Sequence, residues 1–140
     1  MQADAGSGGM VAVGVLALLW NLLGLVMLAL QLSMSPAALA ALPPEQREVY
    51  AATPGWVELA FAVAVLGGLA GSLGLLLRRR WALAGFAVSL AGLVVQIGGA
   101  YAMTPAWTAY GPAGLIMPAV LLVVAALLLG YARRVRARLR

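Results

Sequence analysis

The chain has 140 residues, of which 64% are apolar and 9% are charged, whereas a soluble domain carries about 25% charged residues. It contains no Cys and no His, which excludes disulfides, thiolate catalysis and sites built on the commonest metal ligands. The net charge is +5, and all nine basic residues are Arg. Eight of them lie at 78–80 and 133–140, beside apolar segments. This placement predicts a membrane protein and argues against nucleic acid as a partner.

Four apolar runs cover most of the chain, at residues 10–32, 55–77, 81–103 and 113–132. Each has the ~20 residues that an α-helix needs to cross a ~30 Å hydrocarbon layer. Because lipid offers no hydrogen-bond partner to a bare peptide group, each run must satisfy its own backbone as a helix. We therefore predict an all-α fold, an integral membrane four-helix bundle with up-down-up-down topology. It forms a single transmembrane domain over residues 1–140.

The first connector, residues 33–54, is the longest segment outside the predicted spans. The Ser-Pro pair at 35–36 is typical of a helix N-cap followed by the first helical residue, and the Thr-Pro pair at 53–54 repeats the signal at the start of the second span. This pattern predicts two short interfacial helices, at residues 36–42 and 45–52, on the outer membrane surface. The alternative is an ordered linker that only connects two spans.

Small side chains recur at spacings of three and four residues along the second and third runs, so they form one face on each helix. Membrane helices associate through such faces because close backbone approach gains dispersion contacts that lipid does not offer. We interpret the pattern as helix packing and not as a dimer motif. The predicted packing residues are Gly67, Gly71, Gly74, Gly85, Ser89 and Gly92. In the fourth run, Pro118 predicts a kink near the outer end of the helix.

The arginines also predict the orientation of the chain. The second connector and the C-terminal segment carry eight of them, whereas the first and third connectors carry only Arg47. The positive-inside rule then places the N- and C-termini in the cytoplasm and the first and third connectors outside.

Few polar side chains lie within the predicted spans, and Glu58 is the only ionisable one. At 1.5 Å per residue, Glu58 lies ~6 Å, Gln96 ~12 Å and Asn21 ~18 Å from the outer helix ends, while Gln31 is near the outer surface. An intramembrane carboxylate is costly and indicates function. We predict a polar cavity open to the outside and lined by Glu58, Gln31, Gln96 and Asn21, with Glu58 hydrogen-bonded to Gln31 or Gln96.

A structural interpretation of the same residues stays open. Glu58 falls in the first turns of its helix, where the helix dipole and interfacial water favour a carboxylate. The three amide side chains could instead form interhelical hydrogen bonds that fix the register of the bundle. We expect no catalysis, because general acid–base chemistry needs His or two placed carboxylates, and the remaining acids lie on a loop (Glu45, Glu48) or in the N-terminal tail (Asp4). We also expect no cofactor and no metal.

Several strings, spread in order over nearly the whole chain, carry a resemblance to a known family. They are LWNLLG at 19–24, MSP at 34–36, LAALP at 39–43, PGW at 54–56, AFAVAV at 60–65, LLLRRRWA at 75–82 and YGP at 110–112. The chain resembles a family of small four-span bacterial inner-membrane proteins of unknown function, whose members are often labelled "sugar transporter". The resemblance implies a single compact bundle in the bacterial inner (cytoplasmic) membrane.

Two classes of function remain. In the first, the protein is an accessory or structural subunit that packs through its Gly and Ala helix faces. In the second, it is a small solute carrier or solute-binding protein with an outward-facing cavity around Glu58. A carrier should bring Glu58, Gln31 and Gln96 together at a cavity, whereas an accessory subunit should leave Glu58 in the headgroup layer. The expected partners are the lipid bilayer and either a second copy, as a homodimer, or a larger membrane complex.

Overall fold

The computed structural model describes residues 2–140, and the side chains of residues 8–140. This part of the chain is helical and contains no strand. Four helices are long and apolar enough to cross a membrane: α1 (Gln2–Leu32), α4 (Gly55–Leu76), α5 (Trp81–Met103) and α7 (Ile116–Arg134). The prediction of an all-α fold is therefore confirmed, as is that of four helices long and apolar enough to span a membrane, with helix bounds close to those expected except at the start of α1.

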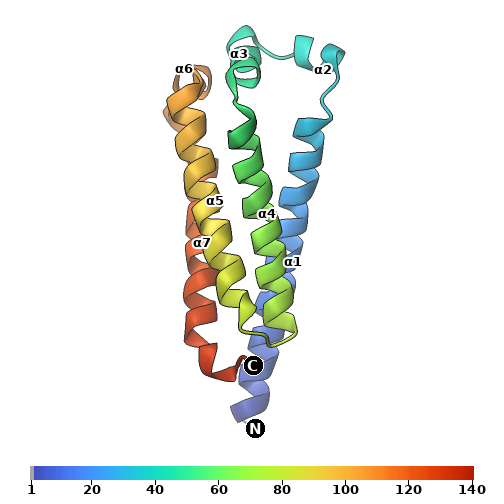
Figure 1. Ribbon diagram of the computed structural model, residues 1–140, viewed down its shortest axis with the longest axis vertical. Coiled ribbons are helices and arrows are strands. Elements are labelled where there is room, and N and C mark those ends of the chain that lie inside the picture. The colour runs from blue at the N-terminus through green and yellow to red at the C-terminus, as the bar shows by residue number, and fades with distance from the viewer. Residues whose placement is uncertain (1) are drawn as a thin grey trace.

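The four long helices lie side by side, and both chain termini are at one end of the molecule (Figure 1). We call this the terminus end. The short helices α2 (Pro36–Ala40), α3 (Pro44–Ala52) and α6 (Ala106–Tyr110) lie at the opposite end, which we call the loop end. The main packing pairs are α1 with α4, α4 with α5, and α5 with α7. The helix contacts thus link the long helices in the order α1, α4, α5, α7, with α4 and α5 as the central pair.

The closest helix pair, α4 with α5, is made by glycines whose missing side chains leave room for the facing backbone. A Cβ at Gly85 would lie 2.5 Å from the amide nitrogen of Gly71, and one at Gly92 would lie 2.9 Å from the carbonyl oxygen of Ala60. No side chain can relieve such a contact, because the facing atoms are backbone. The structure places all six predicted packing residues between α4 and α5: Gly67, Gly71, Gly74, Gly85, Ser89 and Gly92.

The terminus end is closed by an apolar cluster to which the C-terminal segment contributes. Beyond α7 the chain turns through the 3₁₀ helix η2 (Arg136–Arg138) and crosses beneath the bundle (Figure 1). The amide of Arg140 donates to the carbonyl of Arg78 at 2.7 Å, and the amide of Arg80 donates to the carbonyl of Arg140 at 2.9 Å. The buried members of the cluster are Met10, Ala17, Leu75, Ala82, Phe86, Ala132, Val135 and Leu139.

The outward surface of the long helices is apolar. Leu16, Ile116 and Leu127 are each about two-thirds exposed, at 66%, 66% and 67%. Such continuous exposed apolar surface is rare on soluble monomers and is what contact with lipid requires. The surface and the four long helices together fit a membrane protein.

Helix ends differ from the predictions in three places. α1 begins at Gln2 and includes most of the N-terminal tail, because each residue added to an existing helix gains one hydrogen bond at little further cost. Thr53 does not cap α4. Its hydroxyl donates back to the carbonyl of Val49 at 2.6 Å, and α4 starts at Gly55. Pro118 does not interrupt a helix, since α7 begins only at Ile116, and in a first turn the missing amide of a proline is not needed.

Candidate functional site

A cavity of about 510 Å³ lies at the loop end, and we call it the loop-end pocket. All four long helices contribute to it, together with α3, α6 and the 3₁₀ helix η1 (Pro112–Leu115). The connectors therefore cover a space that the diverging ends of the spans leave open. Its polar and aromatic lining consists of Gln31, Tyr50, Thr53, Glu58, Phe61, Gln96, Tyr101 and Tyr110.

Three of the four predicted site residues meet in this pocket, each from a different helix. Gln31 comes from the last turn of α1, Glu58 from the first turn of α4, and Gln96 from α5. All three side chains are partly buried. The expected hydrogen bond from Glu58 to Gln31 or Gln96 is not formed, and none of the three side chains has a hydrogen bond or ion pair within the described part of the chain. Their donors and acceptors are thus free to meet water or a solute.

Three tyrosines complete the polar lining, and they come from the connectors and from α5. The hydroxyl of Tyr101 donates to the carbonyl of Gly114 at 3.1 Å, which ties α5 to η1. The ring of Tyr101 also stands edge-on to Trp107, with ring centroids 6.3 Å apart. Partial burial, together with the nearby hydroxyls of Tyr50 and Tyr101, raises the pKa of Tyr110, so this phenol stays neutral and can donate a hydrogen bond.

Sequence reasoning missed these tyrosines as site residues. A residue in a connector carries no signal of the span against which it folds, so the sequence alone did not place Tyr50 or Tyr110 at the site. The available clue was position: Tyr50 and Tyr110 lie in the two connectors that were predicted to share one side of the membrane.

The charge of the pocket is negative. Glu58 is the only charged residue among those that line it. The carboxylate stands in the first turn of α4, where the positive end of the helix dipole favours an anion. In a partly buried site, water screens the field of a single charge less than it does in bulk solution, so the charge attracts or repels other charged groups over several ångströms. The pocket therefore favours a cationic group over an anionic one.

The fourth predicted residue, Asn21, lies elsewhere. It faces a second cavity of about 290 Å³, nearer the middle of the spans, which we call the interhelical groove. The Asn21 side chain is 9% exposed, and its Nδ2 donates to the carbonyl of Ala17 at 2.8 Å. It fills the space above Gly68, where a Cβ would overlap the amide. Asn21 thus serves the packing of α1 on α4, and it does not line the loop-end pocket with Glu58, Gln31 and Gln96.

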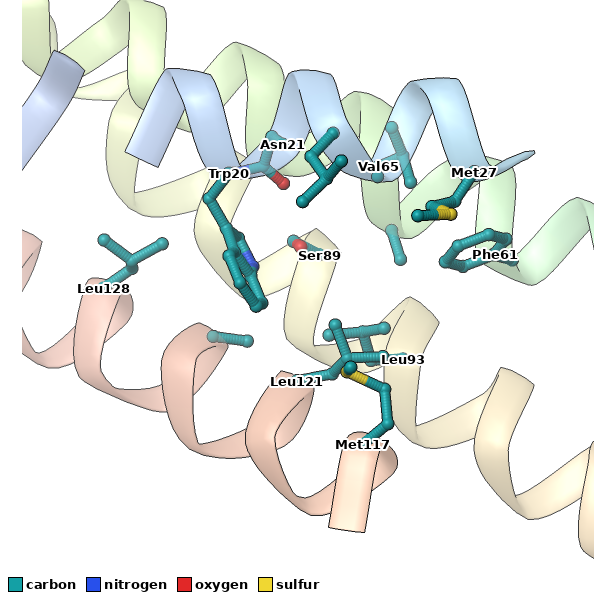
Figure 2. Close-up of a pocket in the computed structure, with 14 residues that line it drawn as sticks. Trp20, Asn21, Met27, Phe61, Val65, Ser89, Leu93, Met117, Leu121 and Leu128 are labelled. Carbon is teal, nitrogen blue, oxygen red and sulfur yellow. The ribbon is translucent and has the colours of Figure 1, made fainter. Parts of the chain in front are cut away.

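The interhelical groove lies between α1 and α7, with α4 and α5 forming its floor. Figure 2 shows Trp20 and Met27 of α1 facing Leu121 and Leu128 of α7 across it. Apart from Asn21 and Ser89, the lining consists of aliphatic, aromatic and methionine side chains and one glycine. The extended helix contacts in the described residues do not include a pairing of α1 with α7, which explains why the groove lies between them.

Neither cavity contains a set of metal ligands: within the described residues there is no group of three His, Cys, Asp or Glu side chains that could hold an ion. Comparison with known proteins adds no function, because no protein-family model, no curated protein and no solved structure matches the chain. The two cavities are therefore the features from which a function can be inferred.

Proposed function

We propose that this membrane protein binds a small polar solute in the loop-end pocket, and that the loop end faces the outside of the cell. One observation carries the proposal: Glu58, Gln31 and Gln96 come from three helices, line one cavity of about 510 Å³, and have side chains with no hydrogen-bond partner within the described chain. A buried polar side chain used only for packing would be hydrogen-bonded, as that of Asn21 is to the backbone carbonyl of Ala17.

The accessory-subunit alternative finds less support in the structure. It relied on Gly and Ala faces that would be free to meet a partner, yet Gly67, Gly85 and Gly92 lie against the backbone of the facing helix within the α4–α5 pair. The pocket, by contrast, is lined by residues from all four long helices of one chain.

The proposed orientation follows from charge. The arginines at 78–80 and 133–140 all lie at the terminus end or in the segment that crosses it. The positive-inside rule places that end in the cytoplasm, so the loop-end pocket opens outward. The apolar cluster at the terminus end supports entry of the solute from the outside only. The bacterial inner membrane is the location that the family resemblance implies, and it forms part of the proposal.

Cysteine labelling tests the site directly, because the chain has no native thiol. Gln96→Cys places one thiol in the pocket. Val95→Cys is the matched control, since the neighbouring Val95 does not line the pocket and is 50% exposed on the apolar outer surface. A charged, membrane-impermeant methanethiosulfonate applied outside sealed cells should modify Gln96→Cys and leave Val95→Cys unmodified, because the reagent reacts only in water.

The same experiment tests the orientation when Arg79→Cys is included. That thiol should react only after the cells are made permeable. Equal rates at positions 95 and 96, or labelling of position 96 only from the cytoplasmic side, would contradict a water-filled pocket that opens outward.

A further inference from the structure

The loop-end pocket and the interhelical groove are adjacent. Phe61 of α4 and Met117 of α7 line both cavities, so these two side chains form the partition between them. On α5 the lining continues at helical spacing, from Gln96 in the pocket to Leu93 and Ser89 in the groove. A ligand that occupied the pocket could therefore extend into the groove along the same helix faces.

The chemistry of the lining changes across this partition. The pocket side carries Glu58, two glutamines and three tyrosines. The groove side is apolar except for Asn21, whose Nδ2 is already bonded to Ala17, and the Ser89 hydroxyl. The partition itself includes a methionine, whose unbranched, flexible side chain adapts to different shapes. Polar chemistry at one end of a continuous space and apolar chemistry at the other suit a ligand with the same two parts.

The dimensions of the groove suit one hydrocarbon chain. Along α7 its lining runs from Met117 to Leu128, which corresponds to ~16 Å of helix. This length is close to the ~15 Å thickness of one leaflet of the hydrocarbon layer. The side chains of Leu23, Met27 and Met117 are 50%, 53% and 60% exposed, so the groove is open toward lipid between α1 and α7. A chain can enter it sideways from the membrane.

We propose that the ligand is a single-chain cationic amphiphile, an alkylammonium, whose head lies beside Glu58 in the loop-end pocket and whose tail passes between Phe61 and Met117 into the interhelical groove. This inference rests on the proposed function and names the class of its solute. The carboxylate of Glu58 attracts the ammonium, and the tyrosine rings that line the pocket can contact it through their faces. A two-chain phospholipid fits less well, because its phosphate would face Glu58 and its second chain has no groove.

The experiment measures how well quaternary ammonium ions protect Gln96→Cys from labelling in nanodiscs of zwitterionic lipid. The two probes are tetramethylammonium, which has a head and no tail, and dodecyltrimethylammonium. The key variant is Gly24→Leu, because Gly24 lines the groove and a Cβ there meets only Val65 Cγ2, at 3.4 Å. The control is Gly98→Leu, because Gly98 lines neither cavity and a Cβ there meets nothing within 4 Å.

We expect Gly24→Leu to raise the half-protecting concentration of the dodecyl compound about tenfold, the equivalent of about two methylenes that lose their burial. Protection by tetramethylammonium should not change, which also shows that the variant is folded. Gly98→Leu should change neither value. Partition of the dodecyl compound into the bilayer affects all variants equally and therefore cancels in this comparison.

Two outcomes would overturn the inference. If Gly24→Leu leaves dodecyl protection at the level of Gly98→Leu, the tail does not use the groove, whereas the polar pocket of the proposed function stands. If a neutral dodecyl glycoside protects as well as the ammonium does, the head is not recognised as a cation. Failure of the proposed function gives a different result, because position 96 would then not react from the outside in the absence of any ligand.

Discussion

At the scale of single residues, the distinctive group is a carboxylate that stands in a membrane protein without a partner. Glu58 is partly buried and lines a pocket with no basic residue. Burying a charge without a counter-ion is unfavourable unless water or a ligand solvates it. The first-turn position on α4 provides part of the compensation through the helix dipole. The rest must come from whatever fills the pocket, and this is why charge selection is the property to measure at Glu58.

We predict that Gln96→Cys reacts faster with a trimethylammonium-ethyl methanethiosulfonate than with the sulfonate-ethyl reagent, after each rate is divided by that for a free thiol in solution. The expected preference is about fivefold, or ~1 kcal/mol, for charges that water partly screens. Adding Glu58→Gln should reduce the preference to about one, while Glu48→Gln on the exposed face of α3 should leave most of it. A preference that survives Glu58→Gln would assign the negative potential to another group.

At the scale of helices, the site depends on the contact between α4 and α5. These helices supply Glu58 and Gln96, and the glycines between them bring the two backbones together. At Gly67 a Cβ would lie 2.9 Å from the carbonyl oxygen of Gly85, so neither helix can move closer or gain a side chain there. The glycine interface and the pocket are therefore two consequences of one helix pairing.

Gly85→Ala is expected to weaken this pairing. The new Cβ would meet the amide nitrogen of Gly71 at 2.5 Å, and because that atom is backbone, the helices must separate. Overpacking of this kind costs about 1–3 kcal/mol. Reversible unfolding in mixed micelles measures the loss. Gly98→Ala is the control, since it meets nothing within 4 Å and should be neutral or stabilising by up to about 1 kcal/mol through helix propensity. Equal stability of the two variants would mean that the α4–α5 backbones do not touch.

At the scale of the whole molecule, the sequence predicted the parts better than their arrangement. The four spans follow from hydrophobic length, and the faces of Gly67 and Gly85 from helical spacing, because both are local properties. The meeting of Gln31, Glu58 and Gln96 could be anticipated because all three lie near helix ends on one predicted side of the membrane. Asn21 could not be placed, since depth along a helix does not say which neighbour it faces.

Features that depend on contacts between distant segments were beyond sequence reasoning. The interhelical groove exists because α1 and α7 flank the α4–α5 pair without an extended contact between them, and no sequence periodicity indicates such an arrangement. The contribution of Tyr110 to the pocket depends on how the third connector folds over the bundle. The part that the C-terminal segment plays in closing the terminus end was not predicted, because its two buried apolar residues, Val135 and Leu139, lie among the arginines at 133–140.

The closed terminus end leads to the last prediction. Leu139 is 4% exposed and packs in the cluster with Met10 and Ala17 of α1, although it lies beyond the last span. If the C-terminal segment seals the bundle, Leu139→Ala should lower the free energy of unfolding by about 2–4 kcal/mol, the usual cost of truncating a buried leucine. The control is Arg138→Ala at an exposed position, which should change the free energy of unfolding by less than about 0.5 kcal/mol.

The seal also separates the pocket from the cytoplasm, so in inside-out vesicles Gln96→Cys should stay unmodified and become reactive when Leu139→Ala is added. A Leu139→Ala protein with unchanged stability, and with a thiol at position 96 that stays unreactive, would show that the segment lies on the bundle without closing it.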